Sequence, residues 1–225
     1  MRITGVTLTV SDVPAAVTFF TEVLELSAIF AGSTAEVTVG RSILLLSEGP
    51  PSAGVHHLAF DIPSDGFEVH RDWLAARVPL LSSAEGVTEF EGPPMWNSRS
   101  VYFEGPDRMV LELIARRERP RTTSHVPEYI SLSEVGLAVP DVAAATASVE
   151  QALNARVLGS ASDEFAPVGD HDGLLILVRP GRGWLPVFDV ESQQLPVQVD
   201  VAPSDGEAGL GRSIPLTDLA IVRVT

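Results

Sequence analysis

Residues 55–66 read VHHLAFDIPSDG, a strand-like run that opens with two adjacent histidines and leads into a helix. Apolar and small residues alternate along it, which is the period of a strand with one buried face. Residues 101–115, VYFEGPDRMVLELIA, form a second signal, a hairpin with a turn at residues 105–107. Its second strand carries one carboxylate, Glu112, inside an apolar run. A histidine on one strand and a lone glutamate on another predict a metal or acid–base site.

Both stretches belong to an internal repeat. GVTLTVSD at residues 5–12 aligns with HLAFDIPS at 57–64, and SILLLS at 42–47 aligns with MVLELI at 109–114. Each copy is predicted to be a βαβββ unit of about 50 residues. The first unit is expected to hold strands at 2–10, 27–31, 35–39 and 42–47 with a helix at 12–26, and the second to hold strands at 55–62, 79–82, 87–91, 99–104 and 108–115 with a helix at 66–77.

The pattern returns after residues 116–127, RRERPRTTSHVP, whose arginines and prolines predict a linker. The third unit is expected to hold strands at 129–139, 156–160, 164–168 and 173–179 with a helix at 142–153. The fourth unit is degenerate, because a Gly- and Asp-rich loop at 204–211 stands where a helix is expected, between strands at 195–201 and 216–224.

We therefore predict an α+β protein, in which tandem βαβββ modules form mixed, curved sheets with a concave cleft. The modules are expected to pair within two halves. The first half is a domain at residues 1–116, built from modules 1–49 and 53–116. After a linker at 117–128, the second half at 129–225 contains one full module at 129–180 and the degenerate module at 181–225.

Composition excludes several classes of function. The chain has 225 residues and a formal net charge of −15, which argues against nucleic acid and against an anionic membrane surface as partners. All 15 basic residues are arginine, so neither a Schiff-base lysine nor a P-loop lysine is available. With no cysteine there is no thiol nucleophile and no disulfide. Without a signal-peptide pattern or a long apolar run, we expect a cytoplasmic protein.

The opening VTLTVSDVPAAVTFFTEVLEL, the strand HHLAFDI and the hairpin VYFEGPDRMVLELI resemble the vicinal oxygen chelate superfamily of glyoxalases, bleomycin-resistance proteins and extradiol dioxygenases. The hairpin is similar to the family's strand pair that ends in a metal-ligating glutamate, although Arg108 and Met109 stand where Gly and Asn are usual. The resemblance covers residues 1–116 well, 129–180 moderately and the remainder poorly. It implies the paired-module fold and a small molecule as ligand.

The resemblance also implies a metal site at Gly5, Leu45, His57 and Glu112, of which only His57 and Glu112 can bind an ion. Firm retention of a divalent ion needs at least three protein ligands, so this set is one short. Four other residues are candidates for a third ligand. His56 is adjacent, but strand alternation directs it to the opposite face. The others are Glu36 on an inner strand, His70 on the second helix, and Glu134, at the position of the third unit that is equivalent to His57. Because the other strands of the second half offer no further ligand at matched positions, that half is expected to be free of metal.

A loop at residues 90–100, FEGPPMWNSRS, is expected to rim the cleft. There Trp96 could stack on a ligand, Asn97 lies beside it, and Arg99 could pair with a carboxylate. Thr7 and Thr9 lie on the expected cleft face of the first strand and are candidate hydrogen-bonding residues. Packing at a sheet edge remains the alternative for Trp96, and simple exposure the alternative for the threonines.

Three functions stay open. The first is a glyoxalase-like lyase or isomerase, or a dioxygenase-like enzyme, in which His57 and Glu112 hold one divalent ion (Fe, Mn, Ni, Zn or Mg) or, without metal, act as a catalytic base and its partner. The second is a metal-free cleft that sequesters a small molecule, as antibiotic-resistance members do. The third gives the second half an assembly role, with a homodimer formed through an exposed sheet face.

Overall fold

The computed structural model describes residues 1–52, 54–117, 126–204 and 209–225. The strands of the first two units are β1 Arg2–Val10, β2 Ser27–Ala31, β3 Thr34–Val39, β4 Ser42–Glu48, β5 His57–Ile62, β6 Phe90–Glu91, β7 Ser98–Glu104 and β8 Val110–Arg116. Those of the last two are β9 Ser131–Ala138, β10 Phe165–Asp170, β11 Gly173–Val178, β12 Val197–Ala202, β13 Ser213–Pro215 and β14 Ala220–Val224. The helices are α1 Val13–Thr18, α2 Phe67–Ala75 and α3 Val142–Leu153, with a π-helical turn η1 at Phe19–Val23 and short 3-10 turns η2 at Ser64–Gly66 and η3 at Pro106–Arg108.

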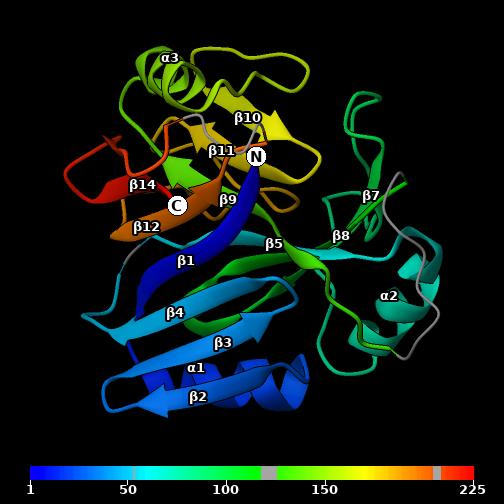
Figure 1. Cartoon of the computed structure of the whole chain (residues 1–225). Helices are drawn as coiled ribbons and strands as arrows, with labels where there is room; N and C mark the ends of the chain where they lie inside the picture. The colour runs from blue at the N-terminus through cyan, green and yellow to red at the C-terminus, as the bar shows by residue number, and fades with distance from the viewer. Residues whose placement is uncertain (53, 118–125, 205–208) are drawn as a thin grey trace.

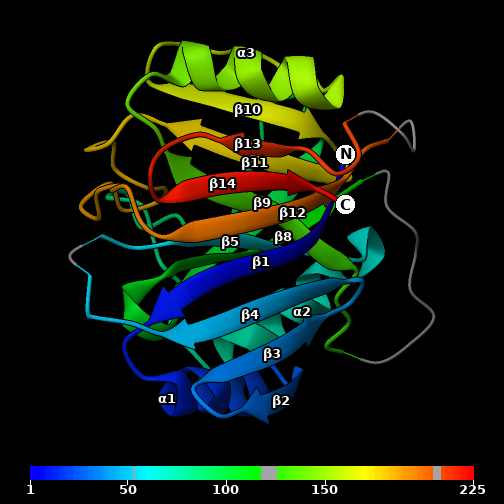
Figure 2. The ribbon, with the colours of Figure 1, turned by 60° about the vertical axis from the view of Figure 1, so that its left-hand side comes forward.

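The strands form two mixed sheets of 7 strands each, which confirms the predicted fold class. The first sheet, sheet A, has the order β13-β14-β12-β1-β4-β3-β2, and the second, sheet B, has the order β10-β11-β9-β5-β8-β7-β6. Figure 2 shows sheet A in front, with β1 crossing ahead of β5 and β8 of sheet B. Each sheet therefore combines two modules that lie far apart in the sequence.

The expected pairing of the first module with the second is wrong. Strand β1 pairs in antiparallel fashion with β12 of the fourth module, while β5 pairs with β9 of the third. The physical reason is that every module exposes the same kind of edge on its first strand, so the repeat alone does not specify which edges join. In Figure 1 the first and last strands, β1 and β14, accordingly lie in the same sheet.

Most predicted elements are present, with a few corrections. The expected strands at 79–82 and 156–160 are reduced to single bridges, Leu80 with Phe103 and Val157 with Val168. Pro79 lacks the N–H that a ladder needs, and Gly159 has a φ of +96°, outside the extended region. The first helix is split between α1 and η1. The fourth module gains β13, which was not predicted, and the expected loop at 204–211 lies partly outside the described residues.

Two helices begin as their sequences indicate. The carboxylate of Asp12 accepts a hydrogen bond from the backbone N–H of Ala15 at 2.8 Å, and that of Asp141 accepts one from Ala144 at 2.9 Å. Each bond satisfies one of the N–H groups that the first turn of a helix leaves unpaired. Among the described residues, no helix is long and apolar enough to cross a membrane.

The main core lies against one face of each sheet. On β5, Leu58, Phe60 and Ile62 belong to a large buried cluster that also includes side chains from β1, α1, α2 and α3. The alternate residues of β5, beginning with His57, point to the opposite face. That face of sheet B carries its own apolar cluster, which includes Tyr102 and Trp184. The strand alternation therefore turns His57 away from the core and toward a second, separate surface.

Candidate metal and ligand site

Sheet B has a cavity of about 640 Å³ on this second face. Its volume falls in the range of small-molecule sites in proteins. Aromatic and other apolar side chains dominate its wall, and they come from both modules of the sheet: Phe90, Pro93, Met95, Trp96 and Tyr102 from the second, and Phe165, Pro167, Ile176, Trp184 and Leu185 from the third and from the segment after it. The third module, which the sequence pattern places in a separate half, therefore lines the same cavity as the second module.

Three ionisable side chains meet at the floor of this cavity. His57 on β5, Glu112 on β8 and Glu134 on β9 each place one potential ligand atom within 4.8 Å of the others. All three are buried, with exposed fractions of 6%, 2% and 2%. Strand register explains the convergence, because Ala59, two residues beyond His57, pairs with Glu112 on one side and with Glu134 on the other.

The ring of His57 has a fixed orientation. Its Nδ1 lies 3.0 Å from the backbone carbonyl oxygen of Val110. A carbonyl can only accept, so Nδ1 carries the proton and Nε2 presents a lone pair. Nε2 lies 3.6 Å from Oε2 of Glu112, and the imidazole stacks on Trp184 with ring centroids 5.0 Å apart. Burial lowers the pKa of His57 to about 4, so the ring is neutral at physiological pH.

Glu112 holds a proton more tightly than an ordinary carboxyl group. Burial, and then the charge of Glu134, raise its pKa to about 8, against the stabilising hydroxyls of Ser100 and Tyr102 and the positive charge of Arg116. A carboxyl group in this state exchanges its proton near neutral pH. Such a group can deliver a proton to a ligand or remove one from it.

Glu134 is held by a buried arginine. Nη2 of Arg116 donates to Oε1 of Glu134 at 2.5 Å, and its Nε and Nη2 each lie 3.2 Å from Oγ of Ser133. The register of β9 against β5 shifts at this point, which brings the adjacent Ser133 and Glu134 to the same guanidinium. Burial raises the pKa of Glu134, while Arg116 opposes that shift. The ion pair therefore favours the charged form of Glu134, and burial disfavours it.

The donor set fits a divalent ion. The three ligand atoms lie within 4.8 Å of one another, near the spacing of about 3 to 4 Å between donors that share one ion. One imidazole nitrogen and two carboxylates suit Mn²⁺, Fe²⁺, Ni²⁺ or Zn²⁺. The hydrogen bond from His57 to Val110 is the outer contact that metal-binding histidines use. Arg116 occupies only one oxygen of Glu134, which leaves the other for a ligand bond.

The structure separates the other predicted residues from this floor. Gly5 and Leu45 line a hollow of about 290 Å³ on sheet A, together with Thr7. Thr9 lines a small crevice beside His56, which faces away from the cavity of sheet B. The expected grouping of Gly5 and Leu45 with His57 is wrong, because the first module belongs to the other sheet.

All three predicted rim residues have structural partners. Trp96 lines the cavity, and its Nε1 donates to the carbonyl of Leu158 at 3.2 Å. Asn97 has a φ of +46°, and its carbonyl accepts from the backbone N–H of Arg117. Arg99 does not line the cavity but lies over the ring of Phe67 at 4.3 Å. Of the rim residues, only Trp96 therefore faces a ligand space directly.

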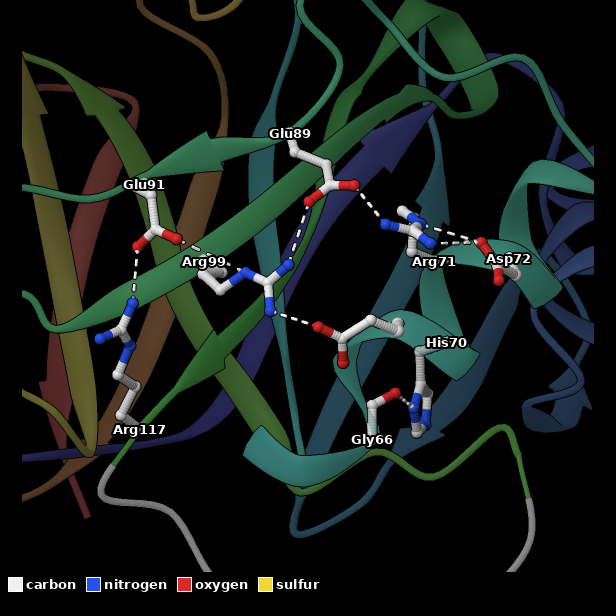
Figure 3. A network of polar contacts seen from close by, with 9 residues as sticks. Gly66, His70, Arg71, Asp72, Glu89, Glu91, Arg99 and Arg117 are labelled. Atoms are coloured by element: carbon white, nitrogen blue, oxygen red, sulfur yellow. Dashed lines mark hydrogen bonds and ion pairs between the residues drawn. The ribbon is translucent and has the colours of Figure 1, made fainter.

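Arg99 is the centre of a surface network of charges (Figure 3). It bonds Glu68 at 2.5 Å and Glu89 at 3.1 Å, and its Nε lies 3.5 Å from Glu91. Glu89 also bonds Arg71 on α2. The network ties α2 to the segment before β6, so Arg99 supports the rim of the cavity from outside.

The sequence interpretation missed two residues of the site, Arg116 and Trp184. Arg116 opens an arginine-rich run and was assigned to the linker, whereas it ends β8 and is 1% exposed. Trp184 is buried and covers the imidazole of His57. The signal for it is Gly136 on β9, where a Cβ would lie 2.4 Å from Cη2 of Trp184. Such a contact cannot be predicted before the fold is known.

Comparisons with known proteins agree with this architecture. No family model matches the chain, and no curated protein matches it. A solved structure of a candidate dioxygenase from Bacillus subtilis subsp. subtilis str. 168 superposes with a TM-score of 0.61 at 14% identity, covering 92% of this chain and 72% of that one. Glyoxalase I from Zea mays superposes with a TM-score of 0.55 at 15% identity, covering 98% and 91%.

These similarities extend over both sheets, so they concern the arrangement of all the modules. At identities of this size they establish a shared fold and leave the chemistry to the residues of the site. The chain therefore shares the fold of this candidate dioxygenase and of glyoxalase I.

Proposed function

We propose that the protein binds a small molecule in the cavity of sheet B, against a divalent ion held by His57, Glu112 and Glu134. The observation that carries this proposal is the convergence of three ligand atoms within 4.8 Å at the buried floor of a cavity of about 640 Å³. Three protein ligands leave further coordination positions open, as in catalytic rather than structural sites. When bound, the ion would act as a Lewis acid toward an oxygen of the ligand.

The residues of the chain have separate tasks in such a reaction. His57 presents the lone pair of Nε2 in a fixed direction, because its Nδ1–H is held by Val110. In the metal-free protein, Glu112 would instead move a proton to or from the ligand, since its pKa of about 8 lies near physiological pH. The aromatic wall excludes water, which strengthens each electrostatic contact inside. A glyoxalase-like or dioxygenase-like reaction would need this combination.

Metal binding can be tested directly. Protein stripped with a chelator is titrated with Mn²⁺ in a calorimeter, and one ion is expected to bind per chain. The variants His57→Ala and Glu134→Gln should each weaken binding by about 100-fold or more, because each removes a direct ligand. Glu36→Gln, which changes a carboxylate in the hollow of sheet A, is the matched control and should leave the affinity unchanged.

One observation favours a second candidate, a metal-free binding cavity. Arg116 already compensates the charge of Glu134 at 2.5 Å, as a metal ion would. In that case Mn²⁺ does not bind, while a small aromatic molecule still does. Equal Mn²⁺ binding by the wild-type protein and by His57→Ala would contradict the metal site at this floor.

A further inference from the structure

We propose that the cavity of sheet B takes a flat, largely apolar molecule that carries one anionic group, and that Arg182 binds this group. The inference names the ligand class of the site described above, and so rests on the proposal that the cavity binds a small molecule. It concerns a residue of the wall and does not depend on whether a metal occupies the floor.

The apolar part of the ligand follows from the wall. Trp96 and Phe165 stack with centroids 6.4 Å apart and an angle of 21° between their planes, and together they form one face of the cavity. Tyr102 and Trp184 line it as well. Aromatic faces of this kind favour flat, unsaturated ligands. Met95 and Leu185, which are 60% and 41% exposed, extend the apolar lining to the surface.

Two arginines lie near aromatic rings of this wall, but only Arg182 lines the cavity, and the two differ in their partners. The guanidinium of Arg116 lies 5.9 Å from the ring centroid of Trp96, and that of Arg182 lies 4.9 Å from the ring centroid of Phe165. Arg116 is neutralised by its bond to Glu134. Arg182 makes no salt bridge within the described part of the chain, and its Nη1 contacts only the carbonyl of Gly183, at 3.3 Å. Glu164 affects it electrostatically without a direct bond.

The anionic group of the ligand follows from this difference. Arg182 is partly buried in the apolar wall, where an unpaired cation is costly and an incoming anion would be favourable. The chain as a whole has a net charge of −15, which repels anions at long range. A ligand with an anionic group would therefore gain its attraction from the local charge of Arg182. A neutral ligand of the same shape would gain none.

A pair of fluorescent dyes separates these contributions. Anilinonaphthalene sulfonate is an aromatic anion, and phenylnaphthylamine has the same ring skeleton without the sulfonate. Binding of each dye is followed by its fluorescence and by energy transfer from tryptophan, in chelator-treated protein. Arg182→Gln should weaken binding of the anionic dye about tenfold and change that of the neutral dye less than about twofold. Arg179→Gln, an exposed arginine outside the cavity, is the matched control and should alter neither dye.

A salt titration of the wild-type protein gives an independent measurement that needs no variant. Raising NaCl from about 0.05 to 0.5 M should weaken binding of the sulfonate several-fold, because salt screens its pairing with Arg182. If only the overall negative charge acted on the dye, salt would strengthen its binding instead. Weaker binding of the sulfonate at high salt therefore indicates a local cation at the site, and stronger binding indicates that none acts on the dye.

The outcomes separate this inference from the proposed function. Binding of both dyes with equal losses in Arg182→Gln, or with none, would overturn the anion-binding role of Arg182 and leave the cavity as a binding site. Stronger binding of the sulfonate at high salt would overturn it as well. If neither dye binds, the cavity does not accept flat apolar molecules and this inference is wrong, whereas the Mn²⁺ titration decides the proposed function separately. Mn²⁺ titration of Arg182→Gln should match the wild type in every case, since Arg182 is not a ligand of the floor.

Discussion

The two sheets are built from the same kind of module, yet among the described residues the cluster of His57, Glu112 and Glu134 lies on sheet B. Ala59 on β5 pairs with Glu112 and Glu134, and Thr7 occupies the same place on β1, where it pairs with Leu45 and Gln198. Each ionisable group of sheet B therefore has a counterpart in sheet A that is unsuited to the task. His57, Glu112 and Glu134 correspond to Gly5, Leu45 and Gln198.

The surroundings of the two faces differ as much as the residues. The cavity of sheet B is covered by the segments at 90–97 and 182–185, whereas the hollow of sheet A, at about 290 Å³, has less than half of its volume. Gln198 bonds to the neighbouring Asp200 at 3.0 Å and needs no outside partner. The comparison shows that the buried ionisable groups lie where a wall covers the sheet. The wall keeps water from these groups, and this burial shifts their pKa values.

The largest effect is expected from breaking the ion pair under the floor of sheet B. Arg116→Met leaves Glu134 buried without its partner, which should reduce the free energy of unfolding by about 3 to 5 kcal/mol. The double variant Arg116→Met, Glu134→Gln should recover part of that loss. Denaturant unfolding measures all three proteins.

The matched control is Arg99→Met, which breaks ion pairs on the surface and should cost less than about 1 kcal/mol. Arg99 is exposed enough for solvent to screen its partners, whereas Arg116 is not. Equal losses in the two single variants would show that burial does not set the strength of the pair.

The next effect concerns pH and distinguishes Glu112 from its counterpart Leu45. The pKa of Glu112 is raised to about 8 in the folded protein from an ordinary value of 4.5, so its contribution to stability is complete below pH 4.5 and is lost as pH rises through about 8. Without metal, the free energy of unfolding should fall by about 1 kcal/mol per pH unit between roughly pH 6 and 7.5.

Glu112→Gln should remove most of this slope, because the amide does not titrate. Thermal unfolding in the presence of a chelator, at several pH values, measures it. A slope that persists unchanged in the variant would assign the pH dependence to another group.

A third effect is expected at Gly136, where the two sheets differ in the space above the strand. A Cβ at residue 136 would lie 2.4 Å from the ring of Trp184, and the corresponding residue in sheet A is Asp200, which has a full side chain. Gly136→Ala should cost about 1 to 3 kcal/mol and displace Trp184 from His57.

Tryptophan fluorescence and denaturant unfolding would show both changes. Asp200→Ala is the control and should leave the fluorescence of Trp184 unchanged, since it alters the other sheet. A Gly136→Ala protein with the stability and fluorescence of the wild type would show that the ring can move without cost.

Much of the architecture could be predicted from local pattern. Alternation predicted β5 and the hairpin pattern predicted β8, and the helices expected from 12 and from 142 begin at the N-caps Asp12 and Asp141. The repeat predicted modules, and the resemblance to the vicinal oxygen chelate superfamily agrees with the fold. These features depend on residues close together in the chain, and for that reason they are visible in the sequence. The strand expected at 79–82 is reduced to a single bridge, because Pro79 has no backbone N–H to donate.

The site was predictable only in part. His57 and Glu112 belong to one module, so their meeting follows from a single pattern of strands. The repeat places Glu134 at the position equivalent to His57, but the predicted pairing puts it in a separate half. Arg116 begins a polar, arginine-rich run, which is typical of a linker. Both errors come from long-range pairing, which a repeat leaves undetermined because its copies offer similar edges.

The sequence by itself determined the modules, their helices and strands, and the presence of a histidine and a glutamate on neighbouring strands. Periodicity and capping act over a few residues, so no knowledge of the whole fold is needed to recognise them. Only the tertiary structure decided that β5 pairs with β9 and β1 with β12. That choice brings Glu134, Arg116 and Trp184 to His57, because a sheet formed between distant modules joins side chains that no local pattern connects.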